Sequence, residues 1–473
     1  IKNALFKVIK VSDASELGSQ IVVQGGTFYN DAVLRSFEKI AGCEAIRPDI
    51  AGIMGAFGAA LYAQERSGGT TTLRSAEDLK NFSYTAKAAT CKGCTAHCAL
   101  SIIRFSDGGR FISGNRCEKG AGKKEAEQLP NLFEWKYRHI LSLAEHQPEK
   151  PKATVGLPLA LHYYDQMPLW HTFFTELGFA VKFSEESTRN TYYKGQSTIP
   201  SDTVCYPAKL THGHIESLLE QGVDFIFYPC MSYNIDEGDS DNHYNCPVVA
   251  YYPELLMANC EKLTDSNFLH PFLDLNRHSH VVKALHTIFA KYASKKEVEQ
   301  ALEHGFAALE QYRKDIVAEG EEIVRQAREA GRQIIVLAGR PYHIDPEINH
   351  GIHKLIASLG LAVITEDSVA HLAQTPELQA LNQWTYHSRM YRAAKYVTTQ
   401  PDMQLVQLVS FGCGIDAITT DEVRRILEDG GKLYTQLKID EISNLGAIKI
   451  RLRSLIAAME QIQKQSPAEP AEA

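Results

Sequence analysis

Two stretches of the chain share one pattern of apolar and polar positions. Each begins with an apolar run that predicts a strand, turns at a proline (Pro158 or Pro341), continues as an amphipathic helix ending in Leu-Gly, and returns to an apolar run. Strand–helix–strand units of this length form parallel sheets with helices against their faces. The pattern predicts an α/β fold with two repeated, doubly wound, Rossmann-like lobes, at about residues 150–290 and 332–458.

Other stretches of the chain predict the elements between, within and after the two lobes. A long charged stretch with a single apolar stripe, residues 291–331, predicts connecting helices that end at Gly331. The Pro- and Ala-rich end, residues 459–473, predicts a disordered tail. Later strands of the two lobes are expected at 224–227, 247–249, 334–338, 361–365, 405–409 and 433–439.

The first 65 residues carry a pattern of strand, double glycine and helix. An apolar run leads into Gly25 and Gly26, Asn30 follows, and Asp31 is expected to cap the next helix. Glycines at such a turn let a nucleotide approach the backbone closely. The pattern gives Gly25, Gly26 and Asn30 as candidate nucleotide contacts, and a plain tight turn is the alternative.

Residues 66–149 combine a polar linker with a cysteine-rich motif of spacing C-x2-C-x3-C-x18-C. Four thiolates at this spacing suit a tetrahedral zinc ion or a cubane iron–sulfur cluster, and the spacing does not choose between them. An intervening strand, D-G-G turn and strand predict a hairpin that returns the fourth cysteine. His97 is an alternative ligand within the motif. The predicted ligands are Cys91, Cys94, Cys98 and Cys117.

Four further cysteines lie beside Pro or Gly near strand-like runs. Cys230 and Cys413 follow predicted strands, and in parallel sheets ligands bind beyond the carboxyl ends of the strands. Cys205 precedes a predicted helix, whereas Cys246 is expected to start a strand. We predict a metal site of Cys205, Cys230 and Cys413 between the two lobes, with Cys246 as an open case. Burial as small apolar side chains is the alternative.

Polar residues near these cysteines are candidates for binding and proton transfer. Arg340 and His343, directly after a predicted strand in G-R-P-Y-H, rank first, followed by Lys209. A cationic side chain here can hold a phosphate group of a substrate or offset the charge of a reduced cluster, and a histidine can supply a proton. The other candidates are His212, His214, Asp345 and His350.

Composition narrows the classes of function. The chain has 473 residues, of which 44% are hydrophobic and 22% charged, as in an ordinary soluble protein of about three domains. A net charge of −8 without long basic runs argues against nucleic-acid binding, and no apolar stretch approaches the ~20 residues of a membrane span. Ten cysteines beside strand-like runs favour a reducing, cytoplasmic setting. Because the chain begins without Met, we expect it to be part of a longer protein.

Two motifs near the start carry a first resemblance. The runs V-V-Q-G-G-T-F-Y-N-D-A-V-L-R-S-F-E and R-P-D-I-A-G-I-M-G-A-F-G-A-A-L resemble the end of the activator ATPases of 2-hydroxyacyl-CoA dehydratases and benzoyl-CoA reductases. The resemblance implies that residues 1–65 are the C-terminal part of an actin-like ATPase domain. It also implies that Gly25 and Gly26 belong to an adenosine-binding segment. The expected phosphate-binding strands do not precede it, so ATP binding would need the missing part of that domain.

Four later motifs carry a second resemblance. The runs I-P-S-D-T-V-C-Y-P-A-K-L-T-H-G-H, Y-N-C-P-V-V, A-G-R-P-Y-H-I-D-P-E-I-N-H-G-I and F-G-C-G-I-D-A resemble the part of large CoA-enzyme-activase proteins that follows their ATPase modules. That part is similar to the iron–sulfur subunits of 2-hydroxyacyl-CoA dehydratases and to double-cubane cluster proteins. The resemblance implies [4Fe-4S] or double-cubane clusters, an ATPase activator module as partner, and a CoA-thioester substrate.

The resemblance leaves the role of Cys246 open. Dehydratase subunits generally use three cysteines per cubane and leave one iron open for substrate. If Cys246 joins the other three cysteines, a closed electron-transfer cluster is favoured, and if it does not, an open catalytic iron is favoured.

The leading hypothesis is an iron–sulfur protein for ATP-driven electron transfer at low potential, as an oxidoreductase or dehydratase-type component. A homodimer is one candidate assembly. The alternative is a non-catalytic scaffold or ligand-binding module with a structural zinc at Cys91–Cys117.

Overall fold

This computed structural model describes residues 1, 5, 14–66, 74–92, 99–114, 129–238, 240–410, 413–441 and 445–465. The chain divides into two compact units, Ile1–Ser83 and Tyr84–Ala473. Each unit is described by itself. None of the helices in the described ranges has the length and apolar character needed to cross a bilayer.

The smaller unit holds a short parallel pair of strands and a small apolar core of Leu5, Val23 and Phe37. Asn30, and not Asp31 as expected, caps its first long helix, because the Asn30 side chain accepts a hydrogen bond from the Ala32 amide at 3.0 Å. Its elements are η2 (Ala14–Leu17), β1 (Ile21–Val22), η3 (Gly26–Tyr29), α1 (Asp31–Ala41), β2 (Ala45–Ile46), η4 (Ala51–Ile53), α2 (Met54–Arg66) and α3 (Ala76–Lys80).

A three-stranded antiparallel sheet begins the larger unit. Its strands are β3 (Tyr84–Thr90), β4 (Ala99–Phe105) and β5 (Arg110–Ser113), in that order. The pairing of β4 with β5 is the hairpin predicted between the third and fourth cysteines of the motif. Cys91 directly follows β3, whereas Cys94, His97, Cys98 and Cys117 lie outside the described residues.

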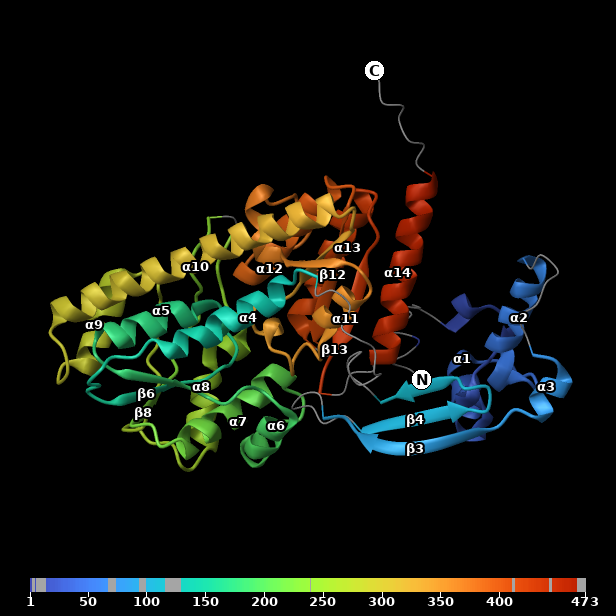
Figure 1. The fold of residues 1–473 in the computed structure, drawn as a ribbon, viewed down its shortest axis with the longest axis horizontal. Helices are drawn as coiled ribbons and strands as arrows, with labels where there is room; N and C mark the ends of the chain where they lie inside the picture. The colour runs from blue at the N-terminus through green and yellow to red at the C-terminus, as the bar shows by residue number, and fades with distance from the viewer. Residues whose placement is uncertain are drawn as a thin grey trace, which may run out of the picture. The chain divides into compact units, whose positions relative to one another are not determined.

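Two four-stranded parallel sheets form the centre of the larger unit (Figure 1). Their strand orders, β7-β6-β8-β9 and β11-β10-β12-β13, place equivalent strands in equivalent positions. The parallel α/β architecture expected from the sequence is therefore confirmed. The first lobe has β6 (Thr154–Leu157), β7 (Ala180–Phe183), β8 (Phe225–Phe227) and β9 (Phe268–Leu269), and the second has β10 (Ile334–Ala338), β11 (Ala362–Thr365), β12 (Met403–Ser410) and β13 (Thr435–Ile439).

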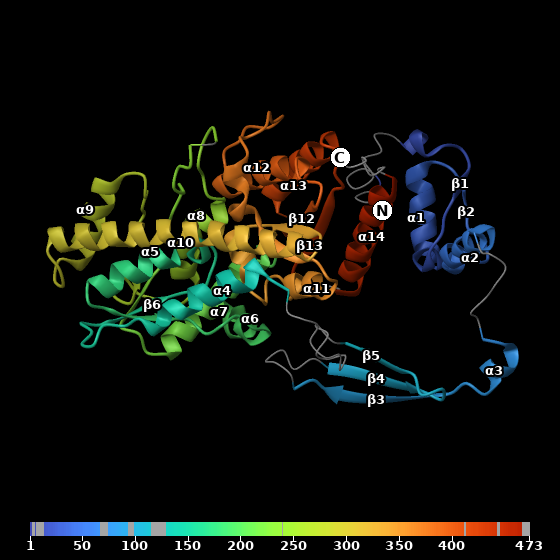
Figure 2. The ribbon, with the colours of Figure 1, turned by 45° about the horizontal axis from the view of Figure 1, so that its top comes forward.

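Helices cover these sheets, and one long helix runs along both lobes (Figure 2). This helix, α10 (Lys295–Glu329), packs on α5 of the first lobe and also touches β11 of the second, so one apolar core spans both lobes. The other helices are α4 (Leu132–Ser142), α5 (Tyr163–Glu176), α6 (Arg189–Gly195), α7 (Tyr206–Glu220), α8 (Pro247–Asn259), α9 (His278–Phe289), α11 (Ile352–Ser358), α12 (Thr385–Thr398), α13 (Gly414–Asp429) and α14 (Leu445–Gln465). Short turns add η6 (Leu143–Glu145), η7 (Gln196–Thr198), η8 (Pro341–Ile344), η9 (Glu366–Ser368) and η10 (Ala370–Leu372).

Two expectations for the lobes are wrong. Residues 247–249 begin α8 and form no strand, because Pro247 occupies the first helical position, where its missing N–H costs nothing. Helix α14 continues to Gln465, beyond the expected end of the lobe at 458, since Leu452, Leu455 and Met459 keep the same apolar spacing against the core.

Candidate functional site

Three of the singled-out cysteines occupy one structural position, the residue that precedes a helix. Cys205, Cys246 and Cys413 are the N-cap residues of α7, α8 and α13, each with an extended backbone. The Cys246 sulfur accepts a hydrogen bond from the Val249 amide at 3.4 Å. Free amides and the helix dipole at an N-terminus favour a negatively charged sulfur.

These three cysteines come together at the meeting of the two lobes. The thiol of Cys205, from the first lobe, interacts electrostatically with Cys246 of the same lobe and with Cys413 of the second lobe. Cys246 interacts with Cys413 in turn. All three are partly buried. Thiols at three helix N-termini of two lobes are therefore near enough to influence one another's charge.

Cys230 has different surroundings. Its amide donates to the Pro271 carbonyl at 2.9 Å, and its own carbonyl accepts from Leu273 at 3.0 Å, which continues the pairing beyond β8 and β9. Burial raises the pKa of its thiol to about 12, and its electrostatic neighbour is Glu254. Cys230 therefore has other neighbours than Cys205, Cys246 and Cys413, and which of the four cysteines bind a metal stays a prediction.

Arg340 lies among the three thiols, directly after β10. Its Nη1 donates to the Cys413 sulfur at 3.4 Å, and its two terminal nitrogens each donate to a carboxylate oxygen of Asp416 at 2.8 Å. Its Nη2 also donates to the Ser410 hydroxyl at 3.3 Å. Burial alone would lower the pKa of Arg340, but Asp416 raises it well above the ordinary value. A permanent positive charge therefore stands beside the thiols.

Burial favours the protonated form of two of the thiols, those of Cys205 and Cys246. It raises the pKa of Cys205 to about 12 and also raises that of Cys246, while Arg340 acts in the opposite direction on both. A metal must displace these protons to bind the sulfurs, so binding would release protons to solvent.

Two buried histidines lie beside the Arg340–Asp416 pair. His343 accepts the Arg340 amide at 2.9 Å through Nδ1, and its Nε2 has no hydrogen-bond partner among the described residues. Neither ring nitrogen of His387 has a hydrogen bond there, and its Nε2 is 3.8 Å from Asp416. Burial lowers the pKa of both histidines. Because Nδ1 of neutral His343 accepts the Arg340 amide, its proton is on Nε2, so His343 can donate a proton and His387 can accept one beside the Arg340–Asp416 pair.

The remaining predicted polar residues have hydrogen-bond partners within the chain, and their functional roles stay predictions. Lys209 pairs across the lobes with Glu441 and donates to the Asp202 carbonyl at 2.8 Å, so its amine is already engaged. His350 contacts the Asp440 carbonyl at 2.6 Å.

Three more of these residues form buried hydrogen bonds. His212 contacts the Thr198 and Tyr252 hydroxyls, and burial lowers its pKa to about 4. His214 contacts the Ser184 and Ser187 hydroxyls, and burial lowers its pKa to about 3. Asp345 accepts hydrogen bonds from Tyr164 and Ser187, and burial raises its pKa to about 6.

The candidate nucleotide residues lie at the turn that was predicted. Gly25 has a φ of 99°, which a side chain would strain, and its amide donates to the Ala51 carbonyl at 2.7 Å. A side-chain atom at Gly25 or Gly26 would meet open space, whereas the Asn30 amide oxygen already caps α1. Their contact with a nucleotide stays a prediction.

A comparison with protein families covers the first lobe and the start of the second. Residues 154–369 match the model of the CoA enzyme activase uncharacterised domain. The match supports the expected relation to CoA-enzyme-activase proteins, and the matched segment contains Cys205, Cys246 and Arg340. Cys413 lies beyond its end.

Comparisons with curated proteins and with solved structures add no evidence on the family or the fold. No curated protein matches the sequence. Among solved structures, the C-terminal domain of glucosamine-fructose-6-phosphate aminotransferase from Francisella tularensis is 11% identical, covers 73% of this chain and 92% of its own, and has a TM-score of 0.17. The N-terminal part of protein BF1531 from Bacteroides fragilis, which contains a phosphatase domain complexed with Mg, is 11% identical over 67% and 97%, with a TM-score of 0.14. At these scores neither likeness bears on the fold.

The donor set distinguishes between kinds of metal centre. Across the described ranges, no three His, Cys, Asp or Glu residues are placed to hold a single metal ion. The ligands of a cubane bind different iron atoms and so lie farther apart than those of one ion. Thiols are the donor type that iron–sulfur clusters use, so the donors fit the predicted group, and the cluster itself stays a prediction.

Sequence reasoning missed two residues of this site, His387 and Asp416. Asp416 stands three positions after Cys413, in the first turn of α13, where a carboxylate can reach back over the helix start. The spacing of cysteine and aspartate in F-G-C-G-I-D could therefore have indicated Asp416 from the sequence. No local pattern marks His387, which lies in α12 and reaches the site only through the fold.

Proposed function

We propose that Cys205, Cys246 and Cys413 hold an iron–sulfur cluster through which this protein carries electrons at low potential in a CoA-enzyme-activase system. The observation that carries the proposal is the convergence of these thiols from three helix N-termini around Arg340. The match of residues 154–369 to the CoA enzyme activase domain supports the system.

When bound, the cluster supplies one-electron transfer. The chain's own residues set the electrostatics of that step. Arg340, 3.4 Å from the Cys413 sulfur, offsets the negative charge gained on reduction, and Asp416 fixes the plane of the guanidinium. The amides at the starts of α7, α8 and α13 add partial positive charge toward the sulfurs.

The neighbouring histidines can accompany the electron with a proton. His343 and His387 are neutral, and each has a ring nitrogen without a hydrogen bond within the described part of the chain. His387 could accept a proton at one of its ring nitrogens, whereas His343, whose Nδ1 accepts the Arg340 amide, carries its proton on Nε2 and could donate it. Three cysteines would leave one iron of a cubane without a thiolate ligand, which favours a site open to an acceptor or substrate.

The resemblance completes the proposed setting. The partner is an ATPase activator module, in the same protein or in a separate chain, and the substrate class is a CoA thioester in the cytoplasm. Gly25, Gly26 and Asn30 would contact adenosine only with the rest of an ATPase domain. The motif Cys91–Cys117 would hold a second centre, either a relay cluster or a structural zinc. A homodimer is part of the same proposal.

Anaerobic purification followed by metal and sulfide analysis tests this function. We expect a brown protein with about four irons and four sulfides for each cubane cluster. A colourless protein with about one zinc and no acid-labile sulfide would contradict the proposed redox function. That result would favour instead a scaffold or CoA-ligand module built around structural zinc at Cys91–Cys117.

A further inference from the structure

A buried tyrosine, Tyr342, lies in the short turn η8 that follows β10, two residues after Arg340 and directly before His343. Only 3% of its surface is exposed. The guanidinium carbon of Arg340 lies 5.4 Å from the centre of its ring, within the range of a cation–π interaction. The His343 ring packs edge-on against it, with ring centres 5.0 Å apart. An arginine and a histidine of the cysteine site therefore hold this side chain.

The hydroxyl of Tyr342 forms no hydrogen bond with the residues that the structure describes. It interacts electrostatically with the thiol of Cys205 and, less strongly, with that of Cys246. Burial raises the pKa of Tyr342 well above its ordinary value, while Arg340 acts in the opposite direction. The hydroxyl therefore keeps its proton and is available as a donor near two thiols.

Two of the three thiols at the helix starts already have a hydrogen-bond donor. Arg340 donates to the Cys413 sulfur at 3.4 Å, and an amide of α8 donates to the Cys246 sulfur at 3.4 Å. Cys205 forms no such hydrogen bond at the start of α7, although the nearby Ala208 amide lowers the pKa of its thiol. Within the described part of the chain, Cys205 is therefore the thiol that still lacks a donor.

Metal binding would change what the Cys205 sulfur can accept. A thiol that gives up its proton to a metal becomes negatively charged, and charged acceptors form the stronger hydrogen bonds. A buried hydroxyl without an acceptor is costly, so a new acceptor nearby would be used. Hydrogen bonds to the sulfurs of a cluster raise its reduction potential, because they stabilise the charge gained on reduction.

We propose that Tyr342 is a positioning residue whose hydroxyl donates a hydrogen bond to the Cys205 sulfur when the cluster is bound, and thereby raises the reduction potential. This inference rests on the proposed function and adds a residue that sets the potential of the same site. Arg340 and Tyr342 would act on different sulfurs, those of Cys413 and Cys205.

The midpoint potential of the cluster, measured by EPR-monitored redox titration of the anaerobic full chain, tests this role. All variants are made in a parent chain carrying Cys91→Ser and Cys94→Ser, so that the cysteine-rich motif adds no signal. Tyr342→Phe removes one oxygen atom and keeps the ring, so iron content should equal that of the parent. Reduction should become about tenfold less favourable, which lowers the one-electron potential by about 59 mV. Tyr342→Met also lacks the hydroxyl and should lower the potential in the same direction.

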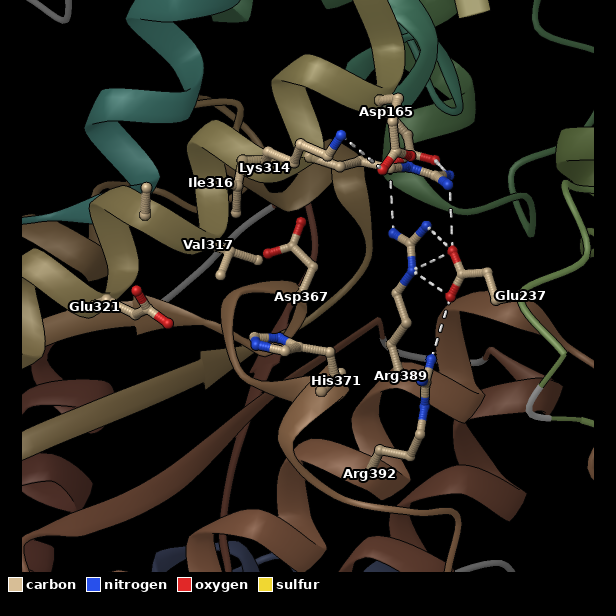
Figure 3. A pocket seen from close by; sticks show the side chains of 14 residues that line it. Asp165, Glu237, Lys314, Ile316, Val317, Glu321, Asp367, His371, Arg389 and Arg392 are labelled. Carbon is tan, nitrogen blue, oxygen red and sulfur yellow. Dashed lines mark hydrogen bonds and ion pairs between the residues drawn. The ribbon is translucent and has the colours of Figure 1, made fainter. Parts of the chain in front are cut away.

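Tyr312→Phe is the matched control. Tyr312 is also buried, with 2% of its surface exposed, and its hydroxyl has no hydrogen-bond partner among the described residues. Its electrostatic neighbours are Asp367 and Asp165, which line a separate cavity of about 380 Å³ beside α10 and α12 (Figure 3). The potential of Tyr312→Phe should equal that of the parent chain.

Iron analysis of the same samples separates two kinds of failure. A parent chain without iron and without an EPR signal would overturn the proposed cluster and the role of Tyr342 together. Full iron content with an unchanged potential in Tyr342→Phe would overturn the role of Tyr342 and leave the cluster in place. An equal fall of the potential in Tyr312→Phe would also overturn that role, because any buried hydroxyl would then have the same effect.

Discussion

The ion pair of Arg340 and Asp416 gives the sharpest prediction about stability. Both side chains are only 5% exposed, and two hydrogen bonds of 2.8 Å join them. Arg340→Met removes the cation and leaves the Asp416 carboxylate buried without its partner. Because breaking a buried pair from one side costs about 3–5 kcal/mol, we expect a loss of that size in the free energy of unfolding.

A second substitution separates the lost pair from general damage. In Arg340→Met/Asp416→Asn the uncompensated charge is gone, so the double variant should regain roughly 1–3 kcal/mol relative to Arg340→Met alone. Arg325→Met is the control, because that arginine is exposed, water screens its ion pairs, and its loss should leave the urea midpoint unchanged.

Urea denaturation followed by tryptophan fluorescence measures these differences. All three tryptophans, Trp135, Trp170 and Trp384, lie in the larger unit, so the signal reports the unfolding of that unit alone. An Arg340→Met variant within about 0.5 kcal/mol of the wild type would refute a buried pair at this position. A double variant less stable than Arg340→Met would refute the cost assigned to the unpaired carboxylate.

Two further stability predictions use the same signal. Five buried histidines (His162, His171, His212, His214 and His353) have pKa values that burial lowers to about 3 or 4. Their unfolded forms take up protons near pH 6.5 and the folded forms do not, so stability should fall by roughly 1.4 kcal/mol per pH unit for each histidine between about pH 6 and 4. A free energy of unfolding that does not change over this pH range would contradict the prediction. Gly213→Ala should cost about 3 kcal/mol or more, because its new atom would lie 1.7 Å from the Thr191 carbonyl oxygen. Gly414→Ala places its new atom in open space and should change stability by less than about 1 kcal/mol. If Gly213→Ala and Gly414→Ala lost equal stability, the close contact of Gly213 with Thr191 would be disproved.

The sequence indicated the sheets better than it indicated the cysteine site. Each strand expected in the second lobe is present, because long apolar runs between turn residues have few alternatives to a buried strand. The short β9 was missed, since two residues carry no periodicity. The apolar run Pro-Val-Val after Cys246 favours a strand, although a proline directly after a capping residue marks the start of a helix.

The partners within the site depended on the fold. Cys230 does follow a strand as expected, but its backbone continues the pairing toward Phe272, and its thiol has Glu254 as its neighbour. Lys209 was a candidate for substrate binding and instead pairs with Glu441, which lies far away in sequence. No local pattern could show either arrangement, because the partners of Cys230 come from later elements of the first lobe and the partner of Lys209 comes from the second lobe.

The choice between Cys246 and Cys230 tests the proposed cluster most directly. Both single serine variants would be made in a chain in which Cys91 and Cys94 are also serine, so that the cysteine-rich motif contributes no signal. The measurement is the low-temperature EPR spectrum of the anaerobic protein after reduction, with iron content determined on the same sample. We predict that Cys246→Ser loses the cluster signal and its iron, while Cys230→Ser keeps both. If Cys246→Ser kept the EPR signal and the iron while Cys230→Ser lost both, the proposed ligand set would be contradicted.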